Sequence, residues 1–172
     1  MYTSIVLFAL TGFGTAAETV APSWQTNYAE AKKQGVTDKK PLAVVIGSGQ
    51  DGWQKLVRGG SLGADQKQLL ANSYVCLYAD LATEEGKRLA QTLQIGKGVG
   101  LVISDHTGNL MAFHHEGDLE AKALTGYLQK YSDPERVVRQ TDTNPGSEFR
   151  AYYPPAAPAQ PAYRPATTGR SC

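Results

Sequence analysis

The sequence predicts a three-layer α/β domain in which a mixed central sheet carries helices on both faces. An unbroken apolar run at residues 42–46 is typical of a strand buried on both faces of a sheet. A second strand-like run covers residues 74–80, and amphipathic segments lie before, between and after these runs. Two apolar segments then flank a short glycine-containing turn at residues 105–109, which predicts an antiparallel hairpin.

The first half of the chain predicts two helices, each followed by a strand. Ser23 is a good N-cap residue for a helix over residues 23–34, and Gly35 is expected to end it. Apolar residues recur in this helix at helical spacing: Trp24, Tyr28 and Ala31. The strand at 42–46 leads into a glycine-rich bend and the start of a helix. A further helix is expected at residues 64–71, before the strand at 74–80.

The second half predicts helix, strand, strand and helix. Thr83 caps a helix that carries Leu89 and Leu93 one turn apart. The strands at 99–105 and 110–114 form the hairpin, and a helix over residues 118–131 ends at Asp133-Pro134. Its apolar stripe comprises Leu119, Leu124, Tyr127, Leu128 and Tyr131. Because helical crossovers favour parallel pairing, the first three strands are expected to run parallel.

Four sequence features, in this order, carry a family resemblance. They are Trp24, Lys40-Pro41-Leu42, Tyr78-Ala79-Asp80 and the run Leu101-Val-Ile-Ser-Asp-His-Thr-Gly108. Over residues 23–132 the chain resembles the thioredoxin superfamily, and in particular its exported bacterial group. The resemblance implies a thioredoxin-like fold with its functional site in the loop after the first strand.

The chain departs from that family at two positions. The bend at residues 49–53 reads Gly-Gln-Asp-Gly-Trp and lacks the two cysteines that the family carries there. The loop of the family's cis-proline reads Gly98-Val99-Gly100. Because a thiolate is the nucleophile of disulfide exchange, this chemistry through the usual motif is excluded.

We therefore expect a non-catalytic binding or scaffolding domain whose site is the degenerate active-site region. Its candidate binding residues are Ser48, Gln50, Asp51, Trp53 and Val99. Trp53 is the obvious aromatic anchor for a protein or peptide partner. No catalytic residue, cofactor or metal is assigned. A net charge of +1 gives no argument for nucleic acid.

The competing hypothesis is a thiol-disulfide oxidoreductase or peroxidase-like enzyme that uses a single atypical cysteine. The chain has two cysteines, Cys76 in a strand-like run and Cys172 at its last position. A lone cysteine within a strand is usually a small buried hydrophobic residue, which argues against catalysis by Cys76. The two could form one bridge, or Cys172 could form an intermolecular bond or carry a modification.

Two other patterns are weaker. The glycines at residues 47–52 could let backbone N–H groups converge on a phosphate, although the Walker ending and the full dinucleotide motif are missing. The alternative is a glycine-filled remnant of an active-site loop. The three histidines with Asp105 and Glu116 could bind a metal, yet His114 and His115 are adjacent and should point to opposite faces of a strand.

The chain is expected to have three parts: a signal peptide (1–17), the domain (18–135) and a tail (136–172). An apolar run at residues 5–10, too short to span a bilayer, precedes small residues at Thr15 and Ala17. This pattern favours a secreted or periplasmic protein with no membrane span in the mature chain. Against it, the first basic residue is Lys32, and the alternative is a buried first element of the domain.

The tail from Thr141 is rich in proline, tyrosine and arginine and has few aliphatic residues. Such a composition predicts disorder or polyproline II, so its removal should cost almost no stability. It suits weak contacts with carbohydrate, a wall polymer or a partner's aromatic groove. The alternative is an inert solubilising tail.

Overall fold

The structure, a computed structural model, describes residues 21–96, 98–133, 135–144 and 152. Its six-stranded sheet has the order β1-β3-β2-β4-β5-β6. The strands are β1 (Trp24–Gln25), β2 (Leu42–Gly47), β3 (Val75–Asp80), β4 (Gly100–Ser104), β5 (Met111–Glu116) and β6 (Asp142–Thr143). The helices are α1 (Tyr28–Asp38), the 3-10 helix η1 (Gly52–Leu56), α2 (Ala64–Ser73), α3 (Glu84–Thr92) and α4 (Ala121–Ser132).

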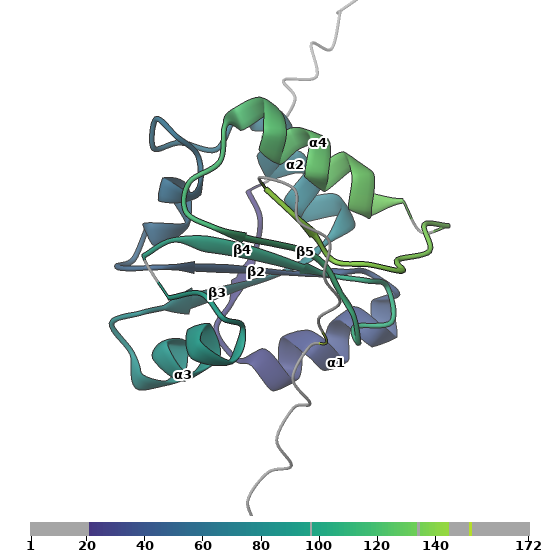
Figure 1. The fold of residues 1–172 in the computed structure, drawn as a ribbon, viewed down its shortest axis with the longest axis horizontal. Coiled ribbons are helices and arrows are strands. Elements are labelled where there is room, and N and C mark those ends of the chain that lie inside the picture. Colours follow the sequence, from purple (N-terminus) through teal and green to yellow (C-terminus); the bar gives the residue numbers. More distant parts are fainter. Residues whose placement is uncertain (1–20, 97, 134, 145–151, 153–172) are drawn as a thin grey trace, which may run out of the picture.

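Helices cover both faces of the sheet: α2 and α4 lie on one face, α1 and α3 on the other (Figure 1). The α/β class with a mixed, three-layer arrangement is therefore confirmed. Alternate residues of β2 enter two separate hydrophobic clusters, since Val45 packs on the α2/α4 side and Val44 on the α1/α3 side. Every residue of β2 is buried, as expected for a strand with helices on both faces.

The predicted cap of α3 and the predicted hairpin are confirmed, whereas the last helix begins at Ala121 instead of residue 118, so Leu119 precedes it. The Thr83 hydroxyl accepts a hydrogen bond from the Gly86 N–H at 3.0 Å and thereby caps α3. In the hairpin turn, the Asp105 carboxylate accepts from the N–H groups of Asn109 and Leu110. Gly108 adopts a positive φ of 69° there. Strands β4 and β5 are antiparallel.

The prediction for the first helix is wrong at both ends. Trp24 lies on the short strand β1, which pairs parallel with β3, and the N-cap of α1 is Asn27. The helix continues through Gly35 to Asp38, and Lys39 ends it in the left-handed conformation. Trp24 and Tyr28 are four residues apart, a spacing that is typical of one face of a helix. For Trp24, pairing with β3 outweighs this local preference for a helix.

The direction of the third long strand is also corrected. β2 and β3 are parallel, as expected, whereas β4 runs antiparallel to β2. β3 ends at Asp80, opposite Gly47, and β4 begins at Gly100, opposite Ile46. The connection through α3 thus begins and ends at the same end of the strands. Because it does not carry the chain back to the opposite end, β4 runs antiparallel to β2.

Residues 141–144, placed in the tail by composition, add a strand to the sheet. Asp142 and Thr143 of β6 pair parallel with Phe113 and His114 of β5, and Thr141 is buried. The expectation that this stretch does not dock is wrong, because its contacts are polar and leave no apolar pattern. Tyr152 also forms an isolated bridge with Leu110. The expected signal peptide and most of the tail lie outside the described residues. Within the described residues, no helix is long and apolar enough to cross a membrane.

Candidate functional site: an aromatic groove beside β1

A groove of about 1040 Å³ lies where β1, the start of α1, the loop after β2 and helix α3 meet. This volume is at the upper end of the range of ligand pockets. Its apolar lining includes Trp24, Tyr28, Trp53, Tyr78 and Leu89. A concave surface with several aromatic side chains is the default binding-site hypothesis for this protein.

The aromatic rings of the groove contact one another. The rings of Trp24 and Trp53 lie 5.6 Å apart between centroids and are tilted by 31°. Trp24 meets Tyr78 edge to face at 6.4 Å. Both tryptophans are half-buried, so each ring combines core packing with a surface facing the groove. The Trp24 indole N–H is buried and has no hydrogen-bond partner among the described residues.

The loop between β2 and η1 is held by hydrogen bonds to residues at the end of β3. The Tyr78 hydroxyl donates to the Gly49 carbonyl at 2.6 Å. Burial and the charge of Asp80 raise the pKa of Tyr78, although a backbone hydrogen bond with Gly52 opposes them. Gly52 must be glycine, because a Cβ there would lie 2.1 Å from the Tyr78 hydroxyl. Gln50 and Trp53 are therefore presented from a loop that β3 supports.

Asp80 provides a second support for the same loop. Its carboxylate accepts hydrogen bonds from the N–H groups of Ala82 at 2.9 Å and Gly49 at 3.1 Å. These two bonds hold the pKa of Asp80 below its usual range. The carboxylate thus occupies the place where a bound phosphate would sit against the Gly49 N–H. This geometry argues against a phosphate site in the glycine loop.

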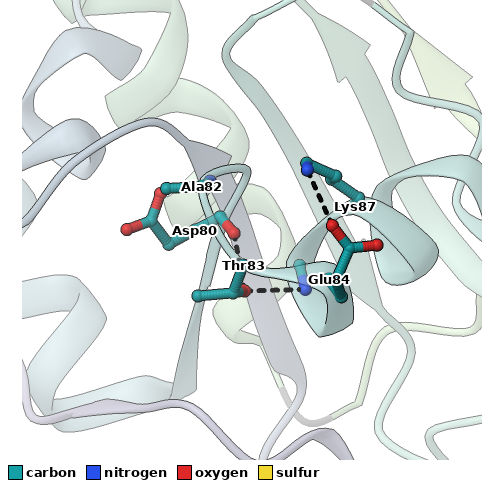
Figure 2. A network of polar contacts seen from close by, with 6 residues as sticks. Asp80, Ala82, Thr83, Glu84 and Lys87 are labelled. Atoms are coloured by element: carbon teal, nitrogen blue, oxygen red, sulfur yellow. Dashed lines mark hydrogen bonds and ion pairs between the residues drawn. The ribbon is translucent and has the colours of Figure 1, made fainter.

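Helix α3 begins directly after β3 (Figure 2). Residues of its first two turns form one wall of the groove. Thr83 donates its hydroxyl proton to the Asp80 carbonyl at 2.8 Å, and Lys87 pairs with Glu84 at 2.8 Å. Gly86 packs so tightly that a Cβ would lie 2.0 Å from the Asp80 carbonyl oxygen. The first turn of α3 therefore lies against the β3 backbone.

The rim of the groove is acidic. Asp80, Glu84 and Glu85 contribute three carboxylates, and Arg88 contributes the one basic side chain among the lining residues. Gln50 adds a polar side chain from the opposite loop. A basic or neutral ligand is therefore favoured over an anionic one.

The structure brings together two of the five predicted site residues. Gln50 and Trp53 line the groove, whereas Ser48 and Asp51 are exposed in the same loop and do not line it. Val99 is half-buried against the α2/α4 core, and its carbonyl accepts from the Gly117 N–H at 2.8 Å. Trp24, Tyr28 and Tyr78 were not predicted as site residues. Their aromatic character was visible in the sequence, but only the β1–β3 pairing brings them together.

Cys76 has the environment of a structural cysteine. The side chain is buried in β3, and its thiol donates a weak hydrogen bond to the Leu70 carbonyl. Burial raises the pKa of the thiol to about 12, and the charge of Lys40 opposes this only in part. A thiol that remains protonated and covered is a poor nucleophile. Cys172 lies outside the described residues.

The histidines are spread over separate contacts. His114 and His115 point to opposite faces of β5, since His114 meets the Leu93 carbonyl and His115 the carbonyls of Asp118 and Asn144. His106 contacts the carbonyls of Lys39 and Asp133 from the hairpin turn. Across the described ranges, no three His, Cys, Asp or Glu side chains come together as a metal site.

No model of a known protein family matches the chain, and a search of curated proteins finds no match. The geometry of the groove is thus the basis for a functional proposal.

Proposed function

We propose that this chain is an exported, thioredoxin-like binding domain that performs no disulfide exchange and binds an extended peptide segment of a protein partner in the aromatic groove. The observation that carries the proposal is the loop after β2. It has no cysteine, and it directs Gln50 and Trp53 into a groove that also contains Trp24 and Tyr78. Aromatic anchors of this kind dominate the binding energy of many interfaces.

The resemblance to thioredoxin-like proteins is supported by the element order and by the mixed sheet with its antiparallel hairpin. The departures from the family argue against disulfide exchange, because residues 49–53 contain no cysteine and residues 98–100 contain no proline. The enzyme hypothesis requires a reactive cysteine, and the burial of Cys76 provides no support for one.

The proposal of export rests on the signal-peptide pattern of residues 1–17. N-terminal sequencing of the native protein should therefore start near Glu18. An intact Met1 would contradict export.

Binding can be read from intrinsic fluorescence. The chain has two tryptophans, and both line the groove, so their emission should change when a ligand covers the rings. We expect Gln50→Arg to weaken binding of peptides selected from a library at least tenfold, since a bulky cation then enters the groove. The control is Gln68→Arg, at an exposed position of α2. Equal affinities for both variants would refute the groove as the site.

The absence of redox activity has its own assay. The protein should not accelerate the reduction of insulin by dithiothreitol, because the loop lacks a thiolate. Turnover that disappears in Cys76→Ser would reject the binding hypothesis in favour of the enzyme.

A further inference from the structure

The segment that follows Tyr152 has a periodicity that composition alone does not reveal. Pro155, Pro158 and Pro161 recur every three residues, and Arg164 occupies the next position of the same series. A polyproline II helix has three residues per turn. In that conformation the three prolines and Arg164 would share one face, a proline stripe that ends in a cation.

This stripe has the chemistry that the groove recognises. Aromatic grooves are a recurring binding site for proline-rich segments, since the rings pack on pyrrolidine faces and the ligand loses little entropy. Charges are also complementary. Residues 149–172 contain three arginines and no acidic residue. Among the described residues that line the groove, Asp80, Glu84 and Glu85 are acidic and Arg88 is basic.

The complete stripe cannot lie in the groove of its own chain, because its first residue, Pro155, follows Tyr152 by only three residues. Tyr152 pairs with Leu110, at the turn end of β5, whereas the groove lies beyond β3 at the Asp80 end. Three residues reach at most about 10 Å, which limits how far Pro155 can be from Tyr152. The order β1-β3-β2-β4-β5 separates β5 from β1 by four strand spacings, or about 19 Å.

We propose that the proline stripe of one copy of this chain (Pro155, Pro158, Pro161 and Arg164) docks in the aromatic groove of a second copy. The inference rests on the proposed function, because it names the partner of the same groove. Mutual exchange of the two segments gives a closed dimer, which is the commonest symmetry of protein oligomers.

The test uses the full-length protein and changes only residues of the tail. The stripe variant combines Pro155→Ala, Pro158→Ala and Pro161→Ala. Its matched control combines Pro154→Ala and Pro165→Ala, which removes prolines outside the three-residue register. A second pair compares Arg164→Glu with Arg170→Glu. Sedimentation and tryptophan emission are measured over a thousandfold range of protein concentration.

We expect the wild type and the proline control to approach twice the monomer mass as concentration rises, with a parallel change in emission. The stripe variant should remain monomeric with constant emission, and Arg164→Glu should weaken association more than Arg170→Glu. Monomers at all concentrations with identical emission in wild type and stripe variant would overturn the proposal. An emission difference that is independent of concentration would show docking within one chain and would also overturn it.

A titration separates this inference from the proposed function. A synthetic peptide of residues 151–166 is added to the full-length stripe variant, whose groove is then free of its own tail. Saturable binding that Gln50→Arg weakens supports both proposals. If this peptide does not bind but library peptides still bind in a Gln50-dependent manner, the second-copy proposal fails while the proposed function stands. If neither binds, both fail.

Discussion

The two edges of the sheet are both formed by strands of two residues, yet they differ in the side-chain hydrogen bonds that anchor the edge strand. At one edge, β6 is anchored to its neighbours by side chains. Thr141 donates to the Met111 carbonyl at 2.7 Å, and Asp142 accepts from Lys130 and from the Tyr131 hydroxyl at 2.5 Å. At the other edge, β1 likewise pairs with two residues, Cys76 and Leu77 of β3, and the Gln25 side chain bonds to Gln34 of α1.

The difference shows how an edge strand can either be anchored by side chains or leave a groove beside it. Residues 78–80 of β3 pair with β2 on one side, and β1 does not extend to them on the other. The groove lies at this uncovered stretch, next to an indole N–H without a partner among the described residues. Edge strands are usually protected, so an edge left partly open beside aromatic rings indicates function.

The largest expected effect concerns the packing of α3 at the open edge. Gly86→Ala should lower the free energy of unfolding by about 3 kcal/mol, because the new Cβ meets the rigid Asp80 carbonyl. The control is Gly126→Ala in α4, where a Cβ meets nothing within 4 Å. That change should stabilise the protein by about 0.5–1 kcal/mol through helix propensity. Urea unfolding measures both, and similar effects of the two changes would show that α3 is not packed against β3.

A smaller effect is expected at the edge formed by β6. Asp142→Asn should cost about 1–2 kcal/mol at pH 7, since Lys130 and Tyr131 lose a charged acceptor that is one-third exposed. Glu84→Gln, which breaks the exposed pair with Lys87, should leave the unfolding midpoint almost unchanged. An equal, small effect of both changes would mean that β6 is not anchored by Asp142.

The same carboxylate predicts a pH dependence. Burial raises the pKa of Asp142, but the hydrogen bonds from Lys130 and Tyr131 and the nearby positive charges outweigh burial and hold the pKa below its usual value. Its stabilisation is therefore complete above the unfolded-state pKa of about 3.9 and is lost as pH falls through the lower folded-state pKa. The difference in melting temperature between wild type and Asp142→Asn should shrink below about pH 4. A gap that stays constant down to pH 2 would contradict this assignment.

The smallest expected effect concerns the alkylation of Cys76, which should not occur in the native protein. Cys76 is opposite Trp24 in the β1–β3 register, so the partly open edge comes close to a thiol. With a pKa of about 12, the buried thiol should resist iodoacetamide at pH 8 in the native state and react only after denaturation. Peptide mass mapping measures the modified fraction at Cys76. Rapid native alkylation would show that the open edge exposes the thiol and would revive the enzyme hypothesis.

Signals carried by a few neighbouring residues could be predicted most accurately from the sequence. Thr83 marked the start of α3 and residues 105–109 the hairpin turn, because a cap and a turn depend on local hydrogen bonds. The position of Trp24 was predicted least accurately, because its helical spacing with Tyr28 is accidental. For the site, Gln50 and Trp53 were predicted from their place after β2, whereas Tyr78 belongs to a strand whose side chain reaches back to Gly49.

The sequence by itself determined the α/β class, the two-sided burial of β2 and the absence of a thiol from the loop that follows it. Those properties depend on residue type and on short-range periodicity. Only the tertiary structure decided the antiparallel direction of β4, the docking of β6 and the assembly of Trp24, Trp53 and Tyr78 into one groove. Each of these depends on pairing between segments far apart in the chain, and the energy of such pairing is absent from any single local pattern.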